Sequence, residues 1–351
     1  MTTQVAVLDD YHGLASSHFD KLNKLIYDVK YFPETLRSFS HADTSQAERD
    51  ELVKRLEPFE VIATMRERTP FPKELIDRLP RLKLILSSGR RNKAIDMEAC
   101  QARGIPVTAT EVTTADSTVE HIITLILAAC HNIVQHVSAV KAGLWQTAFV
   151  SSVSGKTLGL VGLGRLGGAV ARIMSVAFGT KIIAWSPNLT QATADGQAKS
   201  SGLPVEGPDG EKTFKVVSRR EVFETSDVVS VHLVLSDRSR GLITKEDLSR
   251  MKPSSLFVNT SRGPLVVEKD LLAILEAGNI AGAALDVFDI EPLPKDSAWR
   301  SSDWGTNGKS QVLLTPHVAF VEEQSLNSVY QQQVEDLQRW SQGKELKRTM
   351  Y

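Results

Sequence analysis

Three side chains with complementary chemistry follow apolar segments in the second half of the sequence. Arg262, Glu291 and His317 each stand just past the predicted C-terminal end of a strand, where ligands bind in open α/β sheets. An arginine fork holds a carboxylate through two hydrogen bonds, and a histidine of ordinary pKa, about 6.5, donates a proton near neutral pH. A carboxylate beside the imidazole raises the pKa of the histidine. The set predicts reduction of a 2-keto acid, given a hydride donor.

A glycine-rich turn supplies the site for such a donor. Gly162, Gly164 and Gly167 form a G-x-G-x-x-G motif between the predicted strand 157–161 and a helix that continues through 168–174. The first glycine allows a tight turn, the second lets the backbone approach a pyrophosphate, and the third lets helix and strand pack closely. The predicted contacts of this turn with a dinucleotide are Gly162, Gly164, Arg165, Leu166 and Gly167.

The segment after the next strand bears on which dinucleotide binds. An NAD-selective fold places a carboxylate there for the ribose hydroxyls, but strand 181–185 runs into Ser186 and Asn188, and no acid occurs before Asp195. The absence of that carboxylate removes a repulsion of a 2′-phosphate, so both cofactors are allowed and NADP is slightly favoured. Alternatively, Ser186 merely ends the strand and discriminates weakly. Basic residues that would reach a phosphate by folding back are Lys199, Arg219 and Arg220.

Length and composition bound the class of protein. The 351 residues suit two domains, and 42% of them are apolar. Because 41 basic residues nearly balance 42 acidic ones, charge gives no reason to expect a nucleic-acid or membrane partner. Cys100 and Cys130 are too few for a disulfide framework. We expect no leader, and no membrane-spanning helix because no apolar run of about 18 residues occurs. We expect a cytoplasmic protein with no metal site.

Predicted strands and helices alternate along the chain, which indicates the α/β class with parallel sheets. Strand-helix units precede the glycine motif, and a helix at 322–340 follows the last strand. A nucleotide-binding domain inserted into a second α/β domain accounts for this order. Two polar stretches, 190–220 and 295–309, are predicted as surface loops. The other predicted strands are 5–8, 61–64, 82–86, 228–235, 256–260, 282–287 and 312–316, and the other helices 47–56, 73–79 and 118–132.

Four motifs in a fixed order carry a family resemblance. They are the glycine turn, Asn259–Gly263, Glu291-Pro292 and Pro316-His317, and together they resemble the D-isomer-specific 2-hydroxyacid dehydrogenases, including glyoxylate and hydroxypyruvate reductases. The resemblance implies two doubly wound parallel-sheet domains, with a Rossmann-type coenzyme domain inserted into a flavodoxin-like substrate domain. We expect the coenzyme domain at 111–317 and the substrate domain at 1–110 and 318–351. The family gives Arg262, Glu291 and His317 the roles derived above.

The same resemblance implies further contacts. His232, Leu233 and Thr260 are expected to line the cofactor cleft, and Asp286 to contact the nicotinamide amide. Segment 141–146, which contains Trp145, is expected in the contacts of a homodimer. The remaining histidines, such as His121 and His131, are predicted to be packing or surface residues.

The turn after strand 82–86 is expected to select the substrate. In the resembled family, Ser88 and Gly89 correspond to backbone N–H donors for the substrate carboxylate. An apolar residue often follows that glycine, whereas this chain has Arg90. Arg90 either favours a substrate with a second anionic or strongly polar group, or points to solvent or towards a carboxylate such as Glu67. Arg66, after strand 61–64, is another candidate at this edge.

These observations favour an NAD(P)-dependent reductase of small 2-keto acids that oxidises D-2-hydroxy acids in reverse. Phosphite dehydrogenases share the fold and stay as an alternative. Formate dehydrogenases have a glutamine where this chain has Glu291, which argues against formate. A nucleotide-sensing corepressor, similar to the C-terminal-binding proteins, is the alternative from another functional class.

Overall fold

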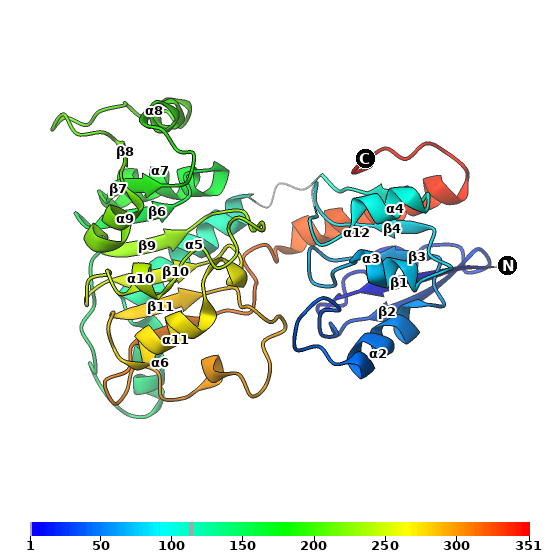
Figure 1. Cartoon of the computed structure of the whole chain (residues 1–351), viewed down its shortest axis with the longest axis horizontal. Helices are drawn as coiled ribbons and strands as arrows, with labels where there is room; N and C mark the ends of the chain where they lie inside the picture. Colours follow the sequence, from blue (N-terminus) through cyan, green and yellow to red (C-terminus); the bar gives the residue numbers. More distant parts are fainter. Residues whose placement is uncertain (1, 91, 112–114) are drawn as a thin grey trace. The chain divides into compact units, whose positions relative to one another are not determined.

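The computed structural model describes residues 2–90, 92–111 and 115–351. The chain divides into two compact units (Figure 1). Unit 1 comprises Met1–Thr114, Ile290–Pro292 and Val321–Tyr351, and unit 2 comprises Ala115–Asp289 and Leu293–Phe320.

Unit 1 contains a five-stranded sheet of order β2-β1-β3-β4-β5 in which every pairing is parallel. This is the flavodoxin-like order, with its switch point between β1 and β3, and it confirms the predicted fold of the outer domain. The strands are β1 Thr3–Leu8, β2 Tyr27–Phe32, β3 Val61–Ala63, β4 Leu84–Leu86 and β5 Val107–Thr108. The helices are α1 Ser16–Phe19, α2 Gln46–Leu56, α3 Lys73–Asp77, α4 Met97–Ala102 and α12 Glu323–Ser341.

Apolar residues of α2, α3 and α4 form one core with the sheet, in which Leu56, Leu75 and Ile85 are fully buried. Helix α12 contacts α1 and β4. A capping box starts α2, because Ser45 accepts from the amide of Glu48 while the Glu48 carboxylate accepts from the amide of Ser45.

Unit 2 contains a seven-stranded, wholly parallel sheet of order β12-β11-β10-β9-β6-β7-β8. Read from β8, the first six strands have the Rossmann order, with the switch point between β6 and β9, as predicted. The strands are β6 Thr157–Val161, β7 Lys181–Trp185, β8 Phe214–Val216, β9 Val228–Val231, β10 Leu256–Asn259, β11 Gly282–Leu285 and β12 Gln311–Leu314. The helices are α5 Ala115–Cys130, α6 Ile133–Lys141, α7 Arg165–Phe178, α8 Gln191–Ser200, α9 Arg219–Thr225, α10 Lys245–Leu248 and α11 Glu268–Glu276.

Two apolar cores lie in unit 2. One joins α5, α7 and α8 to the sheet and contains Ile126, Leu158 and Val170. The other joins α9, α10 and α11 to the sheet and contains Phe223, Leu248 and Phe257. The central strands β9, β10 and β11 are buried throughout, as expected for a parallel sheet covered by helices on both faces.

The prediction of one long loop at 190–220 is wrong. This stretch contains α8, β8 and the first residues of α9. Helix α8 buries only Ala194 and Ala198, so small side chains replace the apolar stripe that marks most surface helices. Its start is set by Thr190, whose side chain accepts from the amide of Thr193. Strand β9 is also shorter than predicted and ends at Val231.

Among the described residues, no single helix is long and apolar enough to cross a membrane, although the bent pair 116–130 and 133–141 together has suitable length and composition. Both cysteines are free thiols. Burial raises the pKa of Cys100 to about 11. In the part of the chain that the structure describes, no cluster of three or more histidine, cysteine, aspartate or glutamate side chains is arranged to hold a metal ion.

Candidate active site

The glycine turn after β6 has the geometry that its motif predicts. Gly162 has φ +109°, and a Cβ there would lie 3.0 Å from the carbonyl carbon and oxygen of His232. A Cβ on Gly167 would lie 2.3 Å from the carbonyl oxygen of Gly162, so only glycine lets α7 approach the strand this closely. Around Gly164, by contrast, a Cβ would meet no described atom within 4 Å. The middle glycine therefore faces open space, as a bound phosphate requires.

Helix α7 begins at this turn with its amides available. Gly164 is the N-cap, no side chain of the described residues caps the helix, and no acidic residue occupies its first turn. Backbone N–H groups and the helix dipole at such an end favour an anion. Arg165 is exposed and Leu166 half-buried at the helix start, and the Gln197 amide of α8 donates to the Gly164 carbonyl at 2.9 Å. The residues present fit a dinucleotide pyrophosphate.

The edge after β7 is polar and uncharged. Ser186 is half-buried and Asn188 is exposed. Arg219 does not supply a free cation, since its guanidinium donates to Asp247 at 2.8 and 2.6 Å and stacks 5.5 Å from the Trp185 ring. Arg220 is paired with a carboxylate of its own helix, Glu224, at 2.7 Å.

Polar atoms without a hydrogen-bond partner among the described residues lie near the carboxyl ends of β9 and β10. They include His232 Nε2 and Thr260 Oγ1, both buried. Burial lowers the pKa of His232 to about 4, so this imidazole is neutral at physiological pH. Leu233 packs against the core beside them. Buried orphan atoms of this kind suit the polar groups of a bound nucleotide.

Arg262 is carried by a turn that Asn259 organises at the end of β10. The Asn259 side chain accepts from the amide of Ser261 at 3.1 Å and donates to the carbonyl of Arg262 at 3.0 Å. A Cβ on Gly263 would lie 2.0 Å from the carbonyl carbon of Phe288, so this turn packs directly on the segment after β11. The Arg262 turn and the Asp286 segment are therefore neighbours at one edge of the sheet.

His317 lies in a second turn at that edge, wrapped around a buried carboxylate. Asp286 accepts from the Thr315 hydroxyl at 2.6 Å and from the amides of Val318 and Ala319 at 2.9 and 3.1 Å. Burial alone would raise the pKa of Asp286, but hydrogen bonds, including that from His121, outweigh it and lower the pKa. His317 itself has φ +52°, a left-handed conformation that is uncommon for a residue with a side chain.

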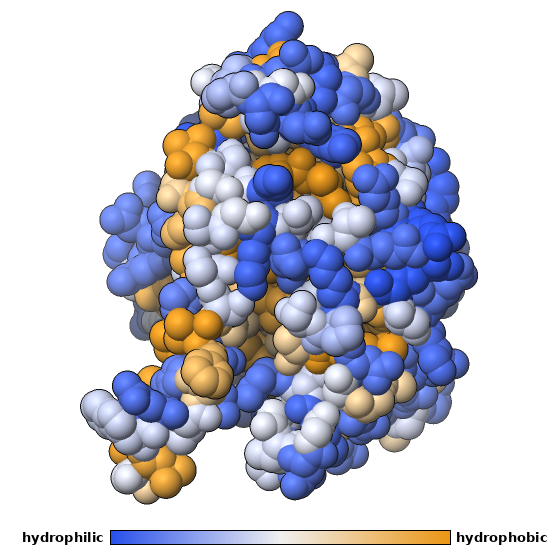
Figure 2. Space-filling view, turned by 90° about the vertical axis from the view of Figure 1, so that its left-hand side faces the viewer, coloured by the Kyte–Doolittle hydropathy of each residue, from blue (hydrophilic) through white to orange (hydrophobic). Residues whose placement is uncertain are grey.

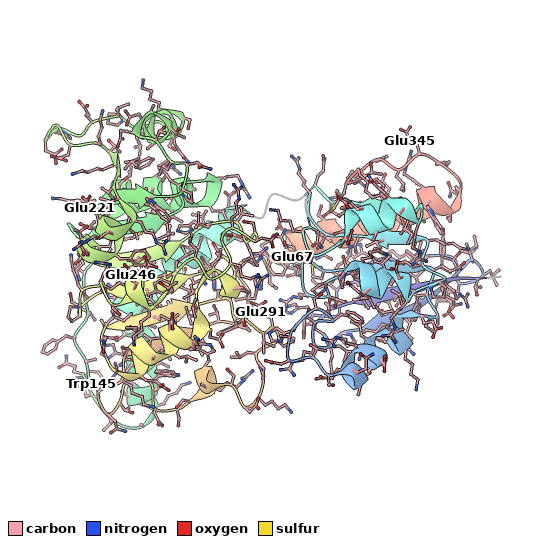
Figure 3. The ribbon with its side chains drawn as sticks, in the orientation of Figure 1. Glu67, Trp145, Glu221, Glu246, Glu291 and Glu345 are labelled. Carbon is pink, nitrogen blue, oxygen red and sulfur yellow. The ribbon has the colours of Figure 1, made fainter. Side chains whose placement is uncertain are left out.

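Glu291 belongs to a different compact unit from the other two predicted catalytic residues. Residues Ile290–Pro292 group with unit 1, whereas Arg262 and His317 lie in unit 2. Glu291, labelled in Figure 3, precedes a proline through a cis peptide bond. The structure thus brings the turns of Arg262 and His317 to the same sheet edge within unit 2, while Glu291 belongs to unit 1.

The predicted substrate turn of unit 1 is closely tied to Arg66. The Ser88 hydroxyl accepts from the amide of Arg66 at 2.5 Å, and the amide of Gly89 donates to Thr110 Oγ1 at 2.6 Å. Gly89 has φ +86°, and a Cβ there would lie 3.0 Å from the Arg66 guanidinium, which therefore covers the glycine. Arg90 is 75% exposed and lies 3.6 Å from the Glu111 carboxylate.

The sequence motifs do not predict any role in the site for His121, which lies in α5. Its Nε2 is 3.1 Å from Thr315 Oγ1 and 3.4 Å from Asp286 Oδ1, and its side chain is 19% exposed. The sequence offers no spacing that connects a residue at 121 with others at 286 and 315, because the fold alone brings α5 beside β11 and β12.

Comparisons with known proteins agree with this geometry. Residues 123–319 match the family model described as D-isomer specific 2-hydroxyacid dehydrogenase, NAD binding domain. A hydroxypyruvate reductase of Blautia hydrogenotrophica is 26% identical over 308 residues, 86% of this chain and 88% of the relative. A glyoxylate reductase of Korarchaeum cryptofilum is 31% identical over 282 residues, 78% of this chain and 77% of the relative. 

A solved structure of a phosphoglycerate oxidoreductase from Vibrio cholerae is 31% identical, with a TM-score of 0.79 over 98% of this chain and all of that one. The family match covers more than half of the sequence and includes the glycine turn and the segments that carry Arg262, Glu291 and His317. The chain belongs to the D-isomer-specific 2-hydroxyacid dehydrogenase family and is an oxidoreductase that uses a nicotinamide cofactor.

Proposed function

We propose that the protein reduces small 2-keto acids of the glyoxylate or hydroxypyruvate type and oxidises the corresponding D-2-hydroxy acids in reverse. The proposal is supported chiefly by one observation, that three candidate site turns lie at the same edge of one parallel sheet. The glycine turn, the Arg262 turn and the His317 turn follow β6, β10 and β12, at the carboxyl ends of their strands.

Each residue has a defined task in this reaction. Arg262 binds the substrate carboxylate with its planar fork and orients the carbonyl carbon for attack. The nicotinamide, when bound, supplies the hydride. The imidazolium of His317 donates a proton to the carbonyl oxygen as negative charge develops there. Glu291 has the role of favouring the protonated form of that imidazole, and in the reverse reaction neutral His317 accepts the proton.

We assign the substrate turn to unit 1. Ser88 and Gly89 form the turn that we assign to the substrate carboxylate, for which the Gly89 amide would exchange its present acceptor, Thr110 Oγ1. Arg90 beside this turn favours a second anionic group. The exposure of Arg90 supports this role, since a long, exposed ion pair with Glu111 costs little to exchange for a substrate anion. The expected contact of Asp286 with the nicotinamide amide stays a proposal, and it requires a rearrangement, because this side chain is fully buried and its oxygens hold the His317 turn.

We propose NADP as the slightly preferred cofactor, with NAD also used. Support comes from the edge after β7, where Ser186 and Asn188 present no carboxylate to a 2′-phosphate. Arg219 is paired with Asp247, so it is not assigned to the 2′-phosphate of NADP. The proposed preference rests on hydrogen bonds from Ser186 and Asn188 to that phosphate and on the absence of a carboxylate that would repel it. Equilibrium binding of both reduced cofactors to the parent protein and to Ser186→Asp checks this, because the new carboxylate should weaken NADPH selectively.

A steady-state panel tests the function itself. Glyoxylate, hydroxypyruvate, a dicarboxylic keto acid and a longer monocarboxylic keto acid are each assayed with NADH and with NADPH, and phosphite with both oxidised cofactors. The proposal predicts turnover with at least one small keto acid. Cofactor binding without turnover of any keto acid would contradict it, and oxidation of phosphite alone would replace it with the phosphite reaction.

We further propose that the protein is a homodimer joined through α6 and the loop that follows it. Figure 2 shows apolar groups at several places on this face of unit 2, including its lower left, and Trp145, labelled in Figure 3, is 78% exposed. So many exposed apolar side chains indicate a protein contact. They are Ile133, Val134, Val137, Val140, Leu144, Trp145, Phe149 and Val150. Light scattering should give a dimer mass for the parent and a monomer mass for Trp145→Glu/Phe149→Glu.

A further inference from the structure

His121 joins α5 to the turn that carries His317. Its Nε2 lies 3.1 Å from Thr315 Oγ1, just after β12, and 3.4 Å from Asp286 Oδ1, just after β11. All three residues belong to unit 2. The contact therefore lies within one compact unit.

The hydrogens of this cluster can be assigned by counting. The single hydroxyl hydrogen of Thr315 points to Asp286 Oδ1, which accepts it at 2.6 Å. Thr315 Oγ1 therefore offers only lone pairs to the imidazole. Asp286 is ionised, because its hydrogen bonds hold its pKa below the ordinary value despite burial, and it too only accepts. Both neighbours of His121 Nε2 are acceptors, so Nε2 carries a hydrogen and donates it.

The same cluster fixes the backbone on both sides of His317. Thr315 precedes it, while the amides of Val318 and Ala319 follow it and donate to Asp286. From the first turn of α5, Thr118 donates its hydroxyl hydrogen to the Ala319 carbonyl at 3.2 Å. A left-handed residue such as His317, with φ +52°, persists only where its surroundings hold it in place.

We propose that His121 is a positioning residue of the active site, which donates from Nε2 to Asp286 and Thr315 and thereby holds the turn that presents His317. The proposal rests on the proposed role of His317 as proton donor. His121 acts through Asp286 and Thr315, and it stands behind the catalytic turn rather than against the substrate.

Two substitutions separate the donated hydrogen from the bulk of the side chain. His121→Gln keeps an N–H donor that can take the position of Nε2, while His121→Met keeps a similar volume and removes the donor. His131→Gln and His131→Met are the matched controls, because His131 follows the same helix and lies outside the cluster. Thr315→Val is a third probe, which removes the bridging hydroxyl and leaves His121 intact.

Hydrogen exchange at the amides of Val318 and Ala319 provides a readout that does not require turnover. We expect exchange about tenfold faster in His121→Met and Thr315→Val, and close to the parent rate in His121→Gln and both His131 variants. In the keto-acid assay kcat should fall about tenfold in His121→Met and recover in His121→Gln, with the cofactor Kd unchanged. If His121→Met does not fold, the exchange rates and kcat of Thr315→Val are compared with those of the parent instead.

Unchanged exchange in His121→Met, or equal losses in the Gln and Met variants, would overturn the positioning role. Should the parent protein turn over no keto acid while exchange still follows the predicted order, the proposed function fails and the hold of His121 on the turn stands. Normal turnover in His121→Met would contradict the link to catalysis.

Discussion

The His317 turn of unit 2 and the Ser88–Arg90 turn of unit 1 are built on opposite principles. Around His317, a fully buried carboxylate gathers a hydroxyl and two amides, and an imidazole supports it from behind. Around Gly89, hydrogen bonds fix the backbone, but the next side chain, Arg90, is largely in water. The residue proposed to donate the proton thus lies in a turn held by a buried hydrogen-bond network, whereas the residue proposed to recognise the substrate can change without disturbing the fold.

The largest effect is expected at Arg262. Arg262→Ala should lower kcat/KM about a thousandfold, because it removes the proposed bidentate, charge-assisted contact with the substrate carboxylate. Arg262→Lys should recover only part of the loss, since an ammonium cannot form the same fork. Cofactor Kd, measured by fluorescence, should stay within a few fold. A kcat/KM near that of the parent in Arg262→Ala would contradict its role as anchor.

Asp286 should affect both stability and turnover. The folded protein lowers its pKa, so this group contributes stability above its unfolded pKa, about 3.9, and the contribution is lost as pH falls through the folded value. Asp286→Asn should therefore lower the Tm at pH 7 and lower kcat about a hundredfold, because one acceptor oxygen is replaced by a donor. The Tm difference from the parent should shrink at pH 3. A difference that stays constant with pH would show that the charge is immaterial.

Gly162 and Gly164 form a matched pair within the glycine turn. Gly162→Ala places a Cβ against the His232 carbonyl at a φ that disfavours alanine, so it should destabilise the protein by about 1–3 kcal/mol. Gly164→Ala meets open space and should leave the Tm unchanged while weakening cofactor binding. Denaturant unfolding and cofactor titration measure the two effects. Equal Tm losses in both variants would contradict the conclusion that Gly162 is a strained position and Gly164 an open one.

A smaller effect is expected at Arg90. Arg90→Met should leave stability unchanged, because the side chain is exposed, and should lower the preference for a dicarboxylic over a monocarboxylic keto acid about three- to tenfold. The ratio of the two kcat/KM values is the relevant quantity. An unchanged ratio would assign Arg90 to the surface pair with Glu111 and leave selection to other residues.

The sequence predicts well those features that local patterns determine. The glycine turn, the parallel strands and the positions of Arg262 and His317 just after strands follow from periodicity and motif spacing, and the structure has them. Helix α8 is not predicted because its buried face consists of alanines. The contacts of His121 are not predicted because helix–sheet packing brings together residues more than 150 positions apart in the sequence. Fold-dependent contacts of this kind have no signature in a single sequence.

The role of His317 is tested most directly by the pH dependence of keto-acid reduction in the parent protein and in His317→Ala. If the imidazolium of His317 is the proton donor, kcat/KM of the parent should fall at alkaline pH. His317→Ala should lose at least about a thousandfold in kcat/KM and show no such fall with pH, while it binds the reduced cofactor normally. A variant that keeps the activity and the pH profile of the parent would contradict the assignment of His317 as the catalytic acid.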